Sequence, residues 1–429
     1  MTRISVIYYF QKMCLTPINI EYVDFFGNRQ SRPVGCGKCY ECLLQLQNMW
    51  KIRMIEESKC WKYCYFFTLT YSDDKLPMNL VADYPCGREV VGELRGKCKN
   101  GLLLDSCEEV LSTACKKDIQ KWFKRFRTSY IRRRAKHLGC YVRDITSNKE
   151  LYNRLKPRFS YFVTAEYAPD GEYVDRHGKL RRSTCRPHYH GLIFSDLPRR
   201  EISALFADWS KNYGFVKWSP VRPRNGAANA VSAPANYAAK YCAKGEFASR
   251  EKDVTDEVVE KPWRLISKGL GASYVDDKRS YHIPPRIKRQ KFEDYIDILL
   301  DRKYYYDGQF KYKLPRYYIE RLYYTRKKFI NEQYNPKTKA FQSVVTYRYV
   351  SANKISLGMQ SALQRRIVAA DKQRFEVAQA SHPMWSYDQI YSYLDMCERT
   401  SLEARRKVAR DKLNRFYTDN ARKNSSLMH

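Results

Sequence analysis

One stretch in the middle of the chain decides the fold: RPHYHGLIF at residues 186–194. It is a strand candidate that ends at Ser195. Successive side chains of a strand point to opposite faces, so His188 and His190 face the same way. Two imidazoles side by side on a rigid strand suit a divalent metal. The alternative is a polar pair on the open face of a sheet.

Strand and helix candidates alternate around this stretch. From runs of aromatic and β-branched residues, strands are predicted at residues 65–71, 159–167 and 214–221. From helical spacing of apolar residues or from Ala and Lys content, helices are predicted at residues 119–131, 202–209 and 236–244. Strands interrupted by helices indicate an α+β or α/β fold. Residues 75–112 carry no clear pattern and are interpreted as an insertion.

Composition separates three regions, which we take as the domain organisation. Residues 1–62 form a Cys-rich segment, residues 63–290 hold the alternating strands and helices, and residues 291–429 are basic, Tyr-rich and then helical. Helices are expected in the last region around residues 363–367 and 402–413. No internal repeat is visible.

Charge and aromatic content indicate a nucleic-acid partner. The 429 residues include 79 Lys and Arg against 46 Asp and Glu, a formal charge of +33, together with 36 Tyr. Single-strand binders pair a cationic groove with aromatic rings on which bases stack. An anionic membrane is the second candidate partner. No run approaches the length of a membrane span, and no signal peptide is visible, so we expect a cytosolic protein without a membrane partner.

Glu166 is the candidate third ligand for a metal at the histidine pair. It lies near the end of the preceding strand candidate, 159–167. If the two strands are neighbours, its carboxylate reaches the same metal. A carboxylate with two histidines, leaving positions open for water or phosphate, accepts Mg²⁺ or Mn²⁺. Such a site polarises a phosphodiester. The alternative is an ordinary surface acid.

Two tyrosines follow on the predicted helix 236–244. Tyr237 and Tyr241 are four residues apart and share a face, as do Lys240 and Lys244. A nearby cation or metal favours the phenolate, which then attacks phosphorus and forms a covalent ester. The alternative is an amphipathic helix that buries its tyrosines against the sheet.

A cysteine cluster near the N-terminus has the spacing of metal ligands. Cys36, Cys39 and Cys42 need a fourth donor to hold zinc tetrahedrally. We favour Cys14 as that donor, and Cys60 or Cys64 are alternatives. Free thiols in a reduced cytosol and an iron–sulfur cluster are the competing interpretations.

These motifs together resemble a known family. The Thr-Leu-Thr strand, the histidine pair and the tyrosine helix occur in the order found in rolling-circle initiators of the HUH endonuclease class. The segments 65–71, 186–194 and 237–244 look like the replication initiation proteins of microviruses, particularly the gokushovirus-like branch. The CGKCYEC segment at 36–42 and the LPRYY segment at 314–318 are also similar to that family.

The resemblance implies an α+β core with a central antiparallel sheet flanked by helices, and a chemistry. Tyr237 or Tyr241 would nick single-stranded DNA at the viral origin of the replicative form, keep the 5′ phosphate and leave a 3′ hydroxyl for a host polymerase. The other tyrosine would later rejoin the circular genome. His188, His190 and Glu166 would hold the metal, and Lys240 and Lys244 would orient phosphate or assist proton transfer. The reaction would take place in the cytoplasm of a bacterial host that also supplies a helicase.

DNA contacts are expected from four further residues, Arg186, Arg316, Tyr317 and Tyr318. Two other functions stay open. One is a non-catalytic single-stranded DNA-binding or packaging protein, which would bind DNA without cutting it. The other is an HUH transposase or plasmid initiator, which would share the chemistry but differ in its DNA target.

Overall fold

The computed structural model describes residues 14, 16–23, 29–96, 109–167, 172–174, 180–182, 185–221, 231–244, 251–308, 310–335, 340–350 and 353–427. The chain forms two compact units. One comprises Met1–Gln45 and Ala272–Asp419, and the other comprises Leu46–Gly271 and Asn420–His429.

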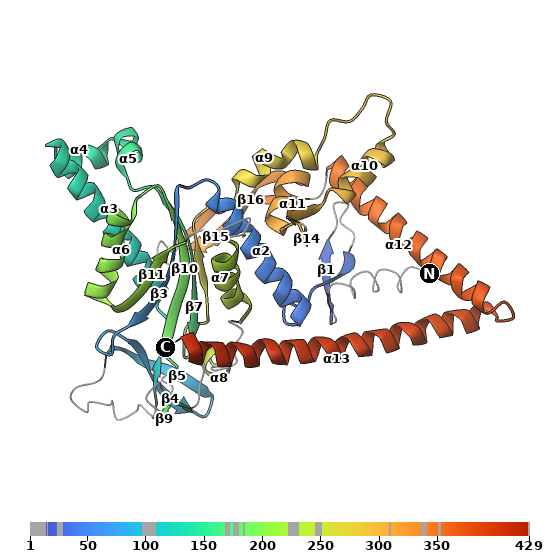
Figure 1. The fold of residues 1–429 in the computed structure, drawn as a ribbon, viewed down its shortest axis with the longest axis horizontal. Coiled ribbons are helices and arrows are strands. Elements are labelled where there is room, and N and C mark those ends of the chain that lie inside the picture. The colour runs from blue at the N-terminus through green and yellow to red at the C-terminus, as the bar shows by residue number, and fades with distance from the viewer. Residues whose placement is uncertain are drawn as a thin grey trace. The chain divides into compact units, whose positions relative to one another are not determined.

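A five-stranded antiparallel sheet is the centre of the second unit (Figure 1). In spatial order its strands are β11 (Gly214–Pro220), β3 (Tyr63–Tyr71), β10 (Pro187–Ser195), β7 (Phe159–Tyr167) and β12 (Arg264–Ile266). Every neighbouring pair is antiparallel. The strand that carries the histidine pair, β10, is therefore the middle one. The predicted strands in this part of the chain are confirmed.

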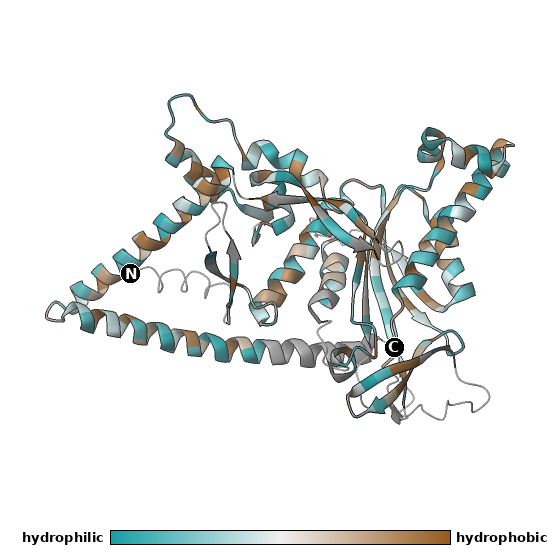
Figure 2. Cartoon of the chain, turned by 180° about the vertical axis from the view of Figure 1, so that it is seen from behind, coloured by the Kyte–Doolittle hydropathy of each residue, from teal (hydrophilic) through white to brown (hydrophobic). Residues whose placement is uncertain are grey.

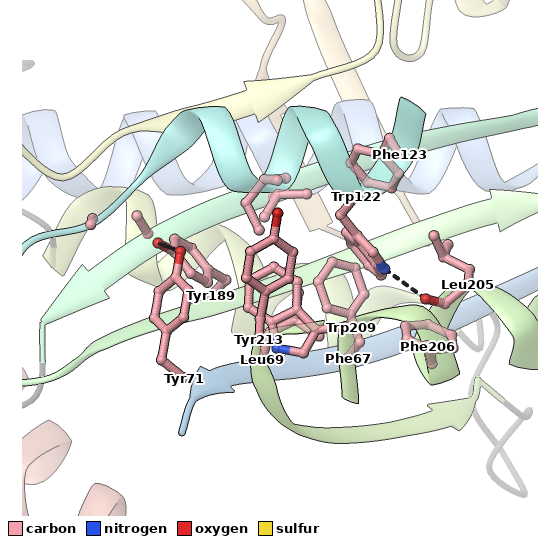
Figure 3. Close-up of a cluster of buried hydrophobic side chains, with 14 of the residues drawn as sticks. Phe67, Leu69, Tyr71, Trp122, Phe123, Tyr189, Leu205, Phe206, Trp209 and Tyr213 are labelled. Atoms are coloured by element: carbon pink, nitrogen blue, oxygen red, sulfur yellow. Dashed lines mark hydrogen bonds between the residues drawn. The ribbon is translucent and has the colours of Figure 1, made fainter. Parts of the chain in front are cut away.

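One face of the sheet packs on two helices, α3 (Lys116–Leu138) and α6 (Arg199–Asn212). Alternate residues of β3, beginning with Tyr65 and Phe67, point to this face and are fully buried. They meet aromatic residues of both helices in the cluster drawn in Figure 3. The indole N–H of Trp122 donates to the carbonyl oxygen of Leu205 at 2.6 Å, which fastens α3 to α6 (Figure 3).

The other face is covered by the later turns of α2 (Tyr40–Ser58) and by α7 (Ser232–Lys244). Here Trp50 and Met54 of α2 pack with Phe162 and Leu192 of the strands. The residues that α7 contributes are small, which lets its backbone approach the sheet closely; they are Ala235, Ala238 and Ala239, all fully buried.

Gly191 sits in the middle of β10, where no side chain fits. A Cβ atom at this position would lie 2.3 Å from the carbonyl oxygen of Phe162 and 2.6 Å from the ring of Phe67. We expect Gly191→Ala to lower the free energy of unfolding by about 2–3 kcal/mol, because the clash is with neighbouring backbone as well as with a ring. Urea denaturation followed by tryptophan fluorescence measures this. A decrease in the free energy of unfolding of less than about 0.5 kcal/mol would contradict this, because it would mean that the strands separate enough to admit the added methyl group.

The described residues of the segment 75–112 form a small antiparallel sheet. Its strands are β4 (Pro77–Tyr84), β5 (Gly87–Arg95) and β6 (Glu109–Ser112), with β4 in the middle. The β4–β5 register shifts between Leu80 and Val81, which breaks the alternation that a sequence pattern would need. The guanidinium of Arg95 binds the carboxylate of Asp118 on α3, with the shorter contact at 2.6 Å.

The remaining elements are shorter or belong to the first unit. In the second unit they are α4 (Val142–Ser147), α5 (Lys149–Leu155), β8 (Glu172–Val174), β9 (Leu180–Arg182) and α8 (Glu251–Thr255). Beyond residue 271 or before residue 45 they are β1 (Ile18–Val23), β2 (Arg29–Val34), α9 (Ser273–His282), α10 (Phe292–Asp301), β13 (Tyr304–Asp307), β14 (Phe310–Lys313), α11 (Arg316–Tyr323), β15 (Thr325–Asn335), β16 (Ala340–Val350), α12 (Lys354–Ser381) and α13 (Tyr387–Leu427).

The last region is not helical throughout. The helices expected around 363–367 and 402–413 lie within α12 and α13. Hydrophobic and hydrophilic turns alternate along α12 (Figure 2). The strands β15 and β16 pair with each other in an antiparallel ribbon that the sequence did not predict.

The mixed helix-and-strand class, the antiparallel sheets and the Cys-rich N-terminal segment are confirmed. Assignment of the central sheet to the HUH class stays a prediction. Among the residues that the structure describes, no helix has both the length and the apolar character to cross a membrane.

Candidate metal and nucleophile site

Polar side chains gather at one end of the sheet face that α2 and α7 cover. Along β10 this face changes from Leu192, buried beneath the helices, to His190 and His188. The flanking strands change at the same level, from Phe66 to Thr68 and Thr70 on β3, and from Phe162 to Thr164 and Glu166 on β7. A polar patch in an otherwise apolar face is an ordinary place for a ligand site.

The two histidines are oriented by the strand beside them. Thr70 Oγ1 lies 3.0 Å from His188 Nδ1, and Thr68 Oγ1 lies 3.1 Å from His190 Nδ1. When each hydroxyl accepts from Nδ1–H, both rings carry their lone pair on Nε2. Metal-binding histidines commonly hold their second nitrogen in this way. Thr68 and Thr70 were not identified as site residues, although their alternation matches that of the histidines.

Glu166 lies where the sequence predicted, on the strand next to the histidine pair. Its Cα atom is directly opposite that of His188, and its Oε2 lies 3.6 Å from His190 Nε2. The His188 and His190 ring centroids are 6.5 Å apart. The three side chains therefore line one patch, with a carboxylate on one side and hydroxyls on the other.

His188 is held neutral at physiological pH. Burial first, and the positive charge of Arg186 second, lower the pKa of His188 to about 4. A neutral imidazole is the form that coordinates a metal. Arg186 itself is anchored: it donates to the carbonyl oxygen of Tyr71 at 3.0 Å and forms an ion pair with Asp73. Its predicted contact with DNA stays a prediction.

Tyr237 projects from α7 toward the same patch. Its ring meets the ring of His190 edge-on, with 6.0 Å between centroids, and also packs edge-on against Phe66 at 5.4 Å. The helix is fixed here by the amide of Gln47 on α2, which donates to the side-chain oxygen of Asn236 at 3.0 Å. The structure thus brings the histidine pair and one of the two predicted tyrosines together.

The other helix residues are placed less fully. Lys240 follows Tyr237 by one turn and is half-buried. Tyr241 and Lys244 belong to α7, but their side chains lie outside the described residues. Their predicted roles stay predictions.

The N-terminal cysteines form a compact group. The sulfur atoms of Cys14, Cys36, Cys39 and Cys42 all lie within 4.8 Å of one another. Within the described part of the chain, no other set of three or more His, Cys, Asp or Glu ligand atoms is this close, so His188, His190 and Glu166 are more widely spaced. The fourth member of this group is Cys14, and neither Cys60 nor Cys64 belongs to it.

Backbone N–H groups point at the sulfurs of this group. Cys36 Sγ accepts from Cys39 N at 3.2 Å and from Lys38 N at 3.4 Å, while Cys14 Sγ accepts from Cys36 N at 3.2 Å. Partial burial opposes ionisation of Cys36, but the hydrogen bonds from the Thr16 side chain and these backbone groups lower its pKa to about 6. A thiolate is the form that binds a metal.

One predicted DNA contact is wrong. Tyr318 on α11 is fully buried, and its ring stacks on Tyr274 with 4.6 Å between centroids. A ring without exposed surface cannot receive a base. Arg316 is exposed and pairs with Glu320 at 2.7 Å, and Tyr317 lies beneath the guanidinium of Arg321 at 3.5 Å. Their predicted contacts with DNA are untested by this arrangement.

Comparison of the chain with protein-family models, with curated proteins and with solved structures finds no match. The family resemblance of the motifs stays a prediction. The function is therefore inferred from the residues of the site.

Proposed function

We propose that this protein is a metal-dependent endonuclease and strand transferase that nicks single-stranded DNA through Tyr237. The observation that supports it most is the position of the Tyr237 ring, edge-on to His190 at 6.0 Å and beside a histidine pair oriented by threonines. A phenol beside metal-ligand side chains is the minimum needed for covalent attack on a phosphodiester.

We assign a hard divalent ion to the histidine patch from the chemistry of its donor atoms. His188, His190 and Glu166 would supply two imidazole nitrogens and a carboxylate oxygen, leaving positions open for phosphate. With Mg²⁺ or Mn²⁺ bound, the site would polarise the scissile phosphate and favour ionisation of a nearby phenol. Glu166 Oε2 is already 3.6 Å from His190 Nε2, and His188, whose ring centroid is 6.5 Å from that of His190, would have to move closer to complete the site.

The chain's own residues then carry the transfer. The Tyr237 oxygen attacks phosphorus, the bond from phosphorus to the 3′ oxygen breaks, and the 5′ phosphate stays on the tyrosine. The phenol proton leaves to solvent, and the departing 3′ oxygen gains a proton from water. The phosphotyrosine ester conserves the free energy of the cleaved phosphodiester bond. A 3′ hydroxyl can therefore later attack this ester and rejoin the strand.

A second tyrosine one turn along the helix would allow the cycle to close. Tyr241 is proposed to cut the regenerated origin while the released 3′ hydroxyl attacks the Tyr237 bond, with Lys240 and Lys244 orienting phosphate. Such a cycle is the one the motif order implies for an initiator of a small circular single-stranded genome. Its partners would be the origin, a host helicase and a host polymerase in the bacterial cytoplasm.

End-labelled DNA tests the proposal. The protein is incubated with Mn²⁺ and a pool of single-stranded oligonucleotides labelled at either the 5′ or the 3′ end. We expect only the 3′ label to migrate with the protein on a denaturing gel, because the 5′ phosphate of the downstream piece is the one retained. A salt-sensitive gel shift without covalent label would instead indicate the non-catalytic binder.

The threonines should tune metal affinity. In the double variant Thr68→Val/Thr70→Val, the Nδ1 atoms lose the hydroxyls that orient them. We expect the Mn²⁺ concentration for half-maximal nicking to rise about 10–100-fold, with activity restored at high Mn²⁺. Thr68→Ser/Thr70→Ser keeps the hydroxyls and is the matched control. Equal Mn²⁺ dependence of the valine and serine variants would contradict a role in ligand orientation.

We further propose that the cysteine group holds a structural zinc ion. Four sulfurs within 4.8 Å of one another suit its tetrahedral coordination. Cys14 precedes the β1–β2 hairpin and Cys36 follows it. A zinc ion bound there would link the two ends of the hairpin to each other and to the start of α2.

A further inference from the structure

The exposed side of α3 carries several positive charges and no exposed acidic side chain. The helix holds ten Lys and Arg residues and one acidic residue, Asp118. Asp118 is 2% exposed and is neutralised by Arg95 while accepting a hydrogen bond from the Tyr71 hydroxyl at 2.8 Å. Asp118 therefore adds no negative charge to the exposed surface of the helix.

A row of cations remains on that surface. The α3 row comprises Lys117, Lys121, Lys124, Arg132 and Lys136, all exposed. The first three are spaced i, i+4 and i+7, which places them on one face. Within the described residues, no carboxylate forms an ion pair with any of these three. At 1.5 Å per residue the row is about 28 Å long.

Other cations of the same helix are engaged in packing. Arg125 binds Asp208, with contacts down to 2.7 Å, and the guanidinium of Arg127 lies over Phe159 at 4.7 Å. Among the described residues, none pairs in this way with Lys117, Lys121 or Lys124. Like charges at i and i+4 destabilise a helix by about 0.2–0.5 kcal/mol. A bound polyanion would remove this cost.

The row offers charge without a platform for bases. The aromatic residues of α3 are Trp122, Phe123, Phe126 and Tyr130, and all are buried. Single-strand sites combine cations with exposed rings on which bases stack. A straight, rigid row of cations alone suits the phosphates of a stiff double helix.

The row also lies away from the histidine patch. α3 packs on the sheet face that carries Phe67 and Tyr189, whereas His188 and His190 point to the opposite face. A nucleic acid bound along α3 is thus a different segment from the one that Tyr237 would attack. We propose that the α3 row is a second, sequence-independent binding surface for the backbone of duplex DNA.

Duplex affinity with and without the row tests this. The full chain carrying Lys117→Ala/Lys121→Ala/Lys124→Ala is titrated into a fluorescent 30-base-pair duplex and into oligo-dT, in EDTA so that nothing is cut. We expect duplex affinity to fall at least about tenfold at 0.1 M salt and the slope of log K against log salt to shrink by about 2–3. Oligo-dT affinity should change less than about twofold. Alanine favours helix, and circular dichroism checks that the fold is kept.

A matched control separates location from net charge. Lys407→Ala/Arg410→Ala/Lys412→Ala removes the same charge from exposed positions of α13. Retained duplex affinity in the α3 variant would overturn the proposal. An equal loss in the α13 control, or an equal loss for oligo-dT, would overturn it as well. Because no divalent ion is present, these outcomes are independent of whether the nicking proposal holds.

Discussion

Replacing Tyr237 with phenylalanine is expected to reduce covalent adduct formation with single-stranded DNA at least about a thousand-fold, because the attacking oxygen is gone. The phenyl ring can keep its edge-on contacts with His190 and Phe66. Folding and DNA affinity should therefore change little. The adduct is quantified on denaturing gels from 3′-labelled DNA, alongside anisotropy with the same DNA.

Two matched tyrosine variants make this test specific. Tyr84→Phe changes an exposed tyrosine of β4 and should leave the adduct at wild-type yield. Tyr241→Phe should leave the first nick intact while blocking the rejoining step. Full adduct yield from Tyr237→Phe, with loss in Tyr241→Phe, would transfer the nucleophile assignment to Tyr241.

Replacing Cys36 with serine is expected to weaken zinc binding more than about 100-fold. Loss of a residue that only supports a ligand typically costs roughly 10–100-fold in metal affinity, and here a ligand itself is lost. Its sulfur lies within 4.8 Å of the other three and accepts two backbone N–H groups. Since metal binding and local folding are coupled, the hairpin of β1 and β2 should also become more protease-sensitive.

Zinc content and competition with a chromogenic chelator measure this effect. Cys60→Ser alters a cysteine outside the group and is the control, expected to bind one equivalent of zinc like the wild type. Equal zinc affinity of the Cys36→Ser and Cys60→Ser proteins would contradict the assignment of this ligand set.

The strands of the central sheet were predictable because aromatic and β-branched residues occupy both of their faces. In β3, buried Tyr65, Phe67 and Leu69 alternate with Phe66 and Thr68. Aromatic and β-branched runs between turn residues therefore identified the strands. The strand order was not predictable from such patterns, since it depends on contacts between segments as distant as β3 and β11.

Two strand groups were missed for physical reasons. In the segment 75–112 the register shift in β4 interrupts the alternation of buried and exposed positions. In β15 and β16 most described side chains are exposed on both faces, so hydrophobicity does not alternate. Neither ribbon leaves the period-two signal on which strand prediction depends.

Residue spacing in the sequence predicted part of the site. The i, i+2 histidines and Glu166 fell on neighbouring strands as expected, and Cys14 joined its three partners. The roles of Thr68 and Thr70 required the register of β3 against β10. Other residue spacings in the sequence also carry a structural signal.

Tyr318 illustrates such a signal. The basic residues near Tyr318 favoured a contact with DNA. Its spacing favours burial instead, because Leu314, Tyr318 and Leu322 recur every four residues, and all three are buried. That pattern is typical of a helix face that packs into a core.

Mass spectrometry of the protein–DNA adduct is the most direct test of Tyr237 as the nucleophile. Trypsin cleaves after Arg224, Lys240 and Lys244, so Tyr237 and Tyr241 fall in separate peptides, 225–240 and 241–244. After nuclease digestion, we expect a residual 5′-nucleotide on the 225–240 peptide at Tyr237. A nucleotide found only on the 241–244 peptide, or on neither, would contradict it.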